Sequence, residues 1–186
     1  MNKKLSSDDF DASNILDIEE ILRLLHQSND SDVKMYFHGA MVDYGFGFKV
    51  AAQQEDITFL EKAIGYAIPE DYKKFLTFTN GLSFNHYDAN IYSIEEVLSF
   101  KNTFDYPNYM LVVATSMSSQ IQIALNLQRD FDSVYVIDPI ADDHFYSIGS
   151  NFTEFFNRFI VSYGSDYWNW GYKNTLKIPK SVDSSG

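Results

Sequence analysis

The best candidate for metal chemistry in the sequence is a short acidic segment that ends in a histidine. Asp138, Asp142, Asp143 and His144 bring carboxylate and imidazole donors close together in the chain. Such donors bind divalent cations, but this spacing matches no calcium-loop template. Pro139 and its polar neighbours equally predict a turn between two strands, with solvated acids at its tip. We favour the turn, because short motifs often match by chance, and we expect neither a metal site nor a cofactor.

Other side chains that could support catalysis are not arranged for it. The four histidines are scattered, and none has the i, i+4 spacing of a helical zinc pair. Glu95 and Glu96 are adjacent on a predicted helix, where neighbouring residues do not face each other. The sequence has no cysteine, G-x-S-x-G elbow, P-loop or dinucleotide-binding fingerprint. We therefore predict a protein that is not an enzyme.

An aromatic-rich run occupies residues 163–172, and Tyr167, Trp168 and Trp170 lie at its centre. Tyrosine and tryptophan are frequent at the energetic centres of protein interfaces. The same residues could instead cover the core where the chain folds back, which is the interpretation we favour, and both can hold in part. An exposed aromatic patch beside acidic residues would indicate a binding surface.

The charge distribution excludes several classes of partner. The chain of 186 residues has a net charge of −12, and residues 84–172 alone contain eleven acids and three bases. Phosphate binding needs clustered Lys and Arg, so direct nucleic-acid binding and docking to an anionic membrane are disfavoured. An acidic surface favours a basic protein partner, although the charge could also serve solubility alone.

The ends of the chain and its apolar runs predict a cytoplasmic protein. Lys3 and Lys4 are followed by acidic residues instead of an apolar segment, so we expect no signal peptide. The longest strongly apolar run, 109–114, is far too short to span a bilayer. We expect one domain at 14–172, between a flexible segment at 1–13 and a flexible tail at 173–186.

Helices are predicted by apolar residues that recur on one face. The first helix covers about 14–27, and a loop-like stretch follows a short strand at 33–37 and continues to about residue 52. A two-helix hairpin then starts with Asp56 as N-cap, stops at Gly65, and resumes with Pro69 in the first turn of its second helix. A last helix spans about 151–163, where Asn151 and Glu154 form a capping pair.

Strands are predicted between these helices, at 91–93, 109–114, 120–127 and 133–138. Ser93 and Glu96 have the spacing of a capping box at the start of a brief helix. Apolar and more polar residues alternate within 120–127, which predicts a sheet with one wetter face.

Two segments carry motifs in a characteristic order. The first carries Ile57, Leu60-Glu61, Ile64-Gly65, Ile68-Pro69, Tyr72-Lys73, Phe75-Leu76 and Asn80-Gly81, and the second runs from Ile148 to Phe156. Together they resemble the SUKH superfamily. Between them, the family's Gly- and Asp-rich turn is replaced by residues 115–119. The resemblance covers about 54–162. It implies a single-domain α+β fold in which a mixed or antiparallel sheet of about five to six strands packs against helices.

Bacterial members of this superfamily are immunity proteins that neutralise polymorphic toxins, often nucleases, and a fungal branch regulates cell-wall synthesis and signalling. Neither branch is known for catalysis. Our leading hypothesis is an immunity protein that blocks a basic toxin, and the alternatives are a scaffold for endogenous partners and a metal-binding protein. The sequence leaves the oligomeric state open. The candidate partner-binding residues are Asp88, Glu95, Glu96, Asp105, Asp142, Asp143, Tyr167, Trp168 and Trp170.

Overall fold

The fold is seen in a computed structural model that describes residues 16–29, 34–37, 39–85, 88–103, 106–118, 120–129, 132–138 and 145–169. The elements of these residues are, in chain order, α1 (Ile18–Asn29), β1 (Lys34–Phe37), β2 (Ala40–Asp43), β3 (Phe46–Phe48), α2 (Gln54–Ile64), α3 (Glu70–Phe78), β4 (Leu82–Phe84), β5 (Asn90–Ile91), α4 (Ile94–Thr103), β6 (Met110–Thr115), β7 (Gln122–Asn126), β8 (Val134–Ile137), β9 (Phe145–Ser147), α5 (Phe152–Val161) and the 3-10 turn η3 (Tyr167–Asn169).

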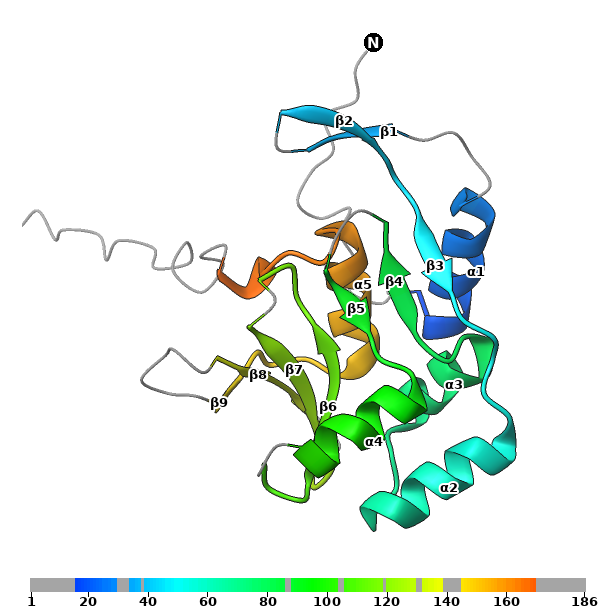
Figure 1. The fold of residues 1–186 in the computed structure, drawn as a ribbon, viewed down its shortest axis with the longest axis vertical. Coiled ribbons are helices and arrows are strands. Elements are labelled where there is room, and N and C mark those ends of the chain that lie inside the picture. The colour runs from blue at the N-terminus through cyan, green and yellow to red at the C-terminus, as the bar shows by residue number, and fades with distance from the viewer. Residues whose placement is uncertain are drawn as a thin grey trace, which may run out of the picture.

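Seven strands form one antiparallel sheet in the order β3-β4-β5-β6-β7-β8-β9. Strands β1 and β2 pair separately as a hairpin, which projects beyond one end of the sheet (Figure 1). The α+β fold with a sheet packed against helices is therefore confirmed, with slightly more strands than we predicted.

The helices cover both faces of the sheet. α1, α3 and α5 pack against one another behind the sheet in Figure 1, whereas α4 lies in front of β6. The core between α3 and α5 is aromatic: the ring centroids of Tyr72 and Phe152 are 4.9 Å apart, and those of Phe75 and Phe156 are 5.5 Å apart. These side chains come from the predicted buried stripes of the two helices, and all four are buried.

The predicted helical hairpin is α2 and α3, with two corrections to its start signals. Asp56 is not the N-cap of α2: Gln53 occupies that position, and the Gln53 N–H donates to the Asp56 carboxylate at 2.9 Å. Pro69 is the N-cap of α3 instead of a residue of its first turn. Both shifts are small. An acid such as Asp56 stabilises a helix start as the N-cap or within the first turn, and a proline such as Pro69 is tolerated as the N-cap or just after it.

Glu61 holds the hairpin together. Its Oε1 accepts hydrogen bonds from the Lys73 side chain at 2.9 Å and from the Ile68 N–H at 3.0 Å. Partial burial alone would raise the pKa of Glu61, but these bonds to Lys73 and Ile68 outweigh it and lower the pKa. The acidic residue in the first helix of the family motif therefore stabilises the fold in this chain.

The prediction of a loop up to residue 52 was wrong, because β2 and β3 lie there. Gly47 in the middle of β3 is unfavourable in a strand, so the sequence of this segment does not predict one. A side chain at this position would collide with the Ser83 hydroxyl on β4, so the glycine permits close pairing. β4, which has only three residues, was not predicted either. β9 also has three residues and was expected only as the strand after the turn at Pro139, without bounds.

The prediction of a wetter sheet face was also wrong. In β7 the residues Ala124 and Asn126 are buried, and Gln122 accepts a hydrogen bond from the Tyr92 hydroxyl at 3.1 Å. Tyr92 in turn stacks on Phe100 of α4, with 4.6 Å between ring centroids. Polar residues on this face thus lie beneath a layer that includes α4.

The first and last helices keep their predicted apolar faces but differ at their ends. α1 begins at Ile18 because the Asp17 carboxylate accepts the Glu20 N–H at 2.9 Å and so caps the helix. α5 has the predicted cap: Asn151 Oδ1 accepts the Glu154 N–H at 2.8 Å. Within the described residues, no helix combines the length and the apolar character that crossing a membrane would require.

Candidate partner-binding surface

Strand register brings several acidic residues to one end of the sheet, which we call the acidic end and define by Asp88, Asp138 and Asp166. Asp88 precedes β5, and Asp138 follows β8. The paired positions Asn90↔Thr115, Thr115↔Gln122 and Gln122↔Ile137 form one row across β5, β6, β7 and β8, so both acids lie beyond the same end of the sheet. Folding, and not proximity in sequence, therefore gathers them.

Asp166 joins this end through the segment that follows α5. Its Oδ2 accepts a hydrogen bond from the Ser118 hydroxyl at 2.7 Å, and the Met117 N–H donates to the Gly164 carbonyl at 2.9 Å. Gly164 also packs directly against Ala89, the residue after Asp88. The loop after β6 and the turn before β5 thus hold the 164–166 segment in place.

Tyr146 of β9 lies close enough to two of these acids to respond to their charge. Partial burial raises the pKa of Tyr146, and the negative charges of Asp138 and Asp166 raise it further. The nearby Trp168 side chain acts in the opposite direction and lowers the pKa. Carboxylates and aromatic rings are therefore neighbours here, but the rings are partly buried and do not form the exposed patch that would indicate a binding surface.

The aromatic run divides between core and surface. Tyr163 is buried, and its hydroxyl donates to the Gly45 carbonyl at 3.0 Å. Tyr167 and Trp168 are half-buried and in ring contact, with centroids 5.2 Å apart, and both pack against the core. Burial raises the pKa of Tyr167 to about 12. The run thus covers the core with one part and leaves rings partly accessible beside Asp166.

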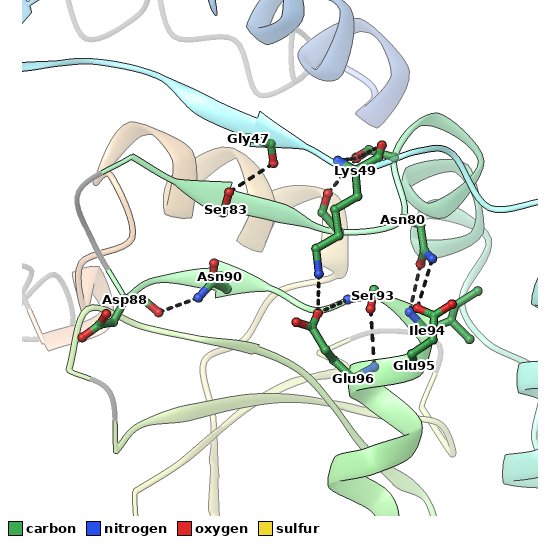
Figure 2. A network of polar contacts seen from close by, with 12 residues as sticks. Gly47, Lys49, Asn80, Ser83, Asp88, Asn90, Ser93, Ile94, Glu95 and Glu96 are labelled. Atoms are coloured by element: carbon green, nitrogen blue, oxygen red, sulfur yellow. Dashed lines mark hydrogen bonds and ion pairs between the residues drawn. The ribbon is translucent and has the colours of Figure 1, made fainter.

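Glu95 and Glu96 lie at the other end of β5 from Asp88, as Figure 2 shows. Glu96 Oε2 accepts the Ser93 N–H at 2.7 Å and pairs with the Lys49 ammonium at 2.7 Å. The Glu96 N–H in turn donates to the Ser93 hydroxyl at 3.4 Å, so the predicted capping box is present. Glu96 therefore fixes the start of α4 to the end of β3.

Asn80 of the family motif belongs to the same junction. Its Oδ1 accepts the Ile94 N–H at 2.9 Å, and its side-chain amide donates to Glu95 at 3.4 Å (Figure 2). Gly81 beside it has φ +109, and a Cβ there would lie 3.0 Å from both the Ile91 carbonyl oxygen and the Ser93 nitrogen. The Asn-Gly pair thus positions β5 and α4 and leaves no space for a larger residue.

The pKa values of both glutamates reflect these contacts. Hydrogen bonding to its own backbone and to the Ser93 side chain lowers the pKa of Glu95. Partial burial alone would raise the pKa of Glu96, but the bonds from Lys49 and Ser93 lower it overall. Both carboxylates are stabilised in the charged form by groups of the protein itself.

The predicted set of contact residues is therefore divided by the fold. Asp88, Tyr167 and Trp168 lie at or beside the acidic end, whereas Glu95 and Glu96 lie at the opposite end of β5. Asp105, Asp142, Asp143 and Trp170 lie outside the described residues. Which of these residues contact a partner stays a prediction.

Sequence reasoning missed Asp166 and Tyr146 as members of the surface, and treated Asp138 only as a metal candidate. Asp166 stands within the aromatic run, so its neighbours were a signal that could have been used. Tyr146 could be found only from the pairing of β8 with β9. Of the candidate metal ligands, Asp142, Asp143 and His144 lie outside the described residues, and the described part of the chain contains no group of three or more possible ligands.

Comparison with known proteins identifies relatives of the chain. Residues 51–158 match the model of the SMI1/KNR4 family (SUKH-1). YnaB, an uncharacterised protein of Bacillus subtilis, is 27% identical over 131 residues, which cover 69% of this chain and 90% of YnaB. YobM, another uncharacterised protein of the same organism, is 24% identical over 138 residues, covering 65% of this chain and 72% of YobM.

Proposed function

The chain belongs to the SMI1/KNR4 family (SUKH-1), and from this premise we propose that it is a non-enzymatic immunity protein that neutralises a basic toxin. Proteins of this family generally act in immunity or regulation by binding other proteins. The proposed mechanism is occlusion: the acidic end covers the toxin's active site and keeps its substrate out.

The observation that carries this proposal is the acidic end itself: Asp88 and Asp138 lie beyond the same end of the sheet, and Asp138 and Asp166 lie close enough to Tyr146 to act on it electrostatically. None of the ion pairs among the described residues involves Asp88 or Asp166. A nuclease cleft is cationic because it must hold phosphates, so an acidic surface can occupy the same field. Half-buried aromatic side chains supply the apolar contact that charge alone lacks.

Co-expression with the toxin domains encoded beside its gene tests this function. Growth of cells that produce one such toxin should be restored by this protein, and failure against every neighbouring toxin domain would overturn the proposal. With the purified pair, association should slow as salt is raised, because screening shortens the range of attraction to about 3 Å at 1 M salt. A rate that does not change with salt would exclude electrostatic steering.

Two matched double variants locate the surface. Asp88→Asn with Asp166→Asn should slow association by about three- to tenfold at low salt, because steering depends on local charge. Glu55→Gln with Glu70→Gln removes the same charge from exposed positions on α2 and α3 and should leave the rate nearly unchanged. Equal effects of the two variants would show that only net charge matters.

A second candidate function, a scaffold that binds endogenous partners, is favoured by the projecting hairpin. Tyr36 on β1 is 72% exposed, and Met41 on β2 is 62% exposed. Large apolar side chains so accessible are typical of contact sites. Affinity purification from unstressed cells distinguishes the two functions: a set of housekeeping proteins, lost with Tyr36→Ser and Met41→Ser, would favour the scaffold, and a single neighbouring toxin would favour immunity.

A further inference from the structure

β9 is an outer strand of the seven-stranded sheet, and no other strand of the described residues pairs with its outer side, which we call the open edge. The pairing Val136↔Tyr146 places Tyr146 opposite Val136, and the Ile148 N–H donates to the Val134 carbonyl at 3.1 Å. The Asn126 N–H donates to the Ser133 carbonyl. The backbone N–H and C=O groups of odd-numbered residues in β8 therefore point toward β7, and those of even-numbered residues point toward β9. Because hydrogen bonding alternates along an antiparallel pair, the backbone groups of Phe145 and Ser147 point away from β8.

These outward groups have no hydrogen-bond partner within the described chain. The one hydrogen bond found for Ser147 uses its side chain, which accepts the Gly149 N–H at 3.1 Å. The ring of Phe145 meets Tyr106 edge to face at 5.7 Å and is still 40% exposed. Natural edge strands are often protected by lysine or proline, and the sequence Phe-Tyr-Ser of β9 has neither.

Acidic residues flank both ends of this open edge. Asp138 directly follows Ile137, the partner of Phe145, and acts electrostatically on Tyr146. At the other end, Asp132 Oδ1 lies 4.0 Å from the position a Cβ would take on Gly149, two residues after Ser147. An extended segment laid along β9 would therefore run between two carboxylates.

The charge at the edge selects one kind of occupant. A second copy of this chain paired through β9 about a two-fold axis would bring Asp132 of each copy toward Asp138 of the other, and like charges would oppose the contact. A segment with lysine or arginine beside an apolar residue would instead meet both acids and the Phe145 ring. Complementarity therefore favours a cationic strand from a different protein.

We propose that the open edge of β9 binds an extended, positively charged segment of the partner protein as an additional strand of the sheet. Backbone hydrogen bonds to Phe145 and Ser147 supply affinity, and side-chain charge supplies selectivity, as in other strand-addition complexes. This inference rests on the proposed function and names the part of the partner that the acidic end and β9 recognise together.

Amide hydrogen exchange followed by NMR tests the proposal with a defined probe, a capped peptide of alternating lysine and valine. In the free protein the Phe145 and Ser147 amides should exchange rapidly, while the Tyr146 amide is protected. A saturating amount of peptide should slow exchange at Phe145 and Ser147 at least tenfold, and the equivalent glutamate–valine peptide should not. Binding without protection at these two amides, or no binding, would overturn the proposal. If the Phe145 and Ser147 amides instead become protected as the protein concentration rises without peptide, the edge pairs with a second copy of this chain. That result would also overturn the proposal.

Variants separate the edge from the fold and from the wider function. Ser147→Pro removes an outward N–H without touching the bonds to β8, and should weaken peptide binding at least tenfold. Phe145→Lys and Phe145→Glu both lose the ring contact and differ mainly in the charge that they introduce. If charge selects the peptide, the lysine variant should bind the cationic peptide more weakly than the glutamate variant does. Unfolding midpoints within a few degrees of the unmodified protein confirm that each variant folds. If the protein neutralises a toxin and all three variants still do so, the edge proposal is refuted and the proposed function stands. If the peptide binds as expected but no toxin is neutralised, the proposed function is refuted and the edge proposal stands.

Discussion

Replacing Glu96 separates a structural role from a role in partner binding. Glu96 Oε2 receives two hydrogen bonds of 2.7 Å, from the Ser93 N–H and from Lys49. Glutamine keeps an acceptor for Ser93 but loses the charge, whereas alanine loses both contacts. We therefore expect Glu96→Gln to destabilise the protein less than Glu96→Ala, and neither to change the association rate as much as Asp88→Asn with Asp166→Asn.

The size of the effect follows from the geometry. The Lys49 and Glu96 side chains are 43% and 46% exposed, so water screens their pairing and its contribution is about 0.5 kcal/mol. The helix cap contributes about 1 kcal/mol more. Glu96→Gln should therefore cost roughly 0.5 kcal/mol and Glu96→Ala roughly 1.5 kcal/mol. For a chain of this length, the alanine variant should lower the unfolding midpoint by about 3–6 °C.

The pH dependence provides the sharper measurement. The folded pKa of Glu96 is lowered, so the stability that its charge contributes is fully present above the unfolded pKa of about 4.3 and is lost as pH falls through the folded pKa. Urea unfolding of wild type and Glu96→Gln should thus differ at pH 7 and converge below about pH 4. Lys49→Met should reduce this pH-dependent difference without abolishing it, because the bonds from Ser93 still lower the pKa of Glu96. Equal stability of all variants at pH 7, or a difference that persists in acid, would refute the reasoning.

Four further substitutions test contacts that hold the fold together, each by urea unfolding at neutral pH. Gly81→Ala should cost about 2 kcal/mol or more, because φ is +109 and the new methyl group meets two backbone atoms at 3.0 Å; an unchanged midpoint would contradict this. Asp71→Ala should cost about 1–2 kcal/mol, because Asp71 accepts both the N–H and the hydroxyl of Thr153 at the start of α5. Thr153→Val removes only the hydroxyl bond and should cost less than Asp71→Ala. Tyr163→Phe should cost about 1–3 kcal/mol, because its buried hydroxyl bonds to Gly45; a neutral effect would mean that water replaces it.

Helices were the part of the fold that local sequence could predict. The apolar faces of α3 and α5 recur within a single turn, so residues such as Phe75 and Phe155 reveal their burial without knowledge of the rest of the chain. Capping pairs are equally local, which is why Asn151 and Ser93 were interpreted correctly. The errors at Asp56 and Pro69 are shifts within one turn, where several residues can begin a helix.

Short strands and the surface could not be predicted in the same way. β4 and β9 have three residues each, too few for alternation to stand out, and they are defined by their neighbours in the sheet. Asp88 and Glu95 are close in sequence, yet they lie at opposite ends of β5. Only pairing across β5, β6, β7 and β8 shows that Asp88 belongs with Asp138.

The residues that carry the family resemblance are occupied by internal contacts. Glu61 binds Lys73 and the backbone of Ile68, and Asn80 caps α4, so these side chains determine where the elements lie. The acidic end and the edge of β9 are instead formed by strand ends, such as Asp138 and Phe145, that the hairpin motif does not include. Partner choice can therefore change at these strand ends while the hairpin remains intact. Membership of the family accordingly predicts the scaffold well, and under the proposed function the identity of the partner should depend on the charge and shape of this surface.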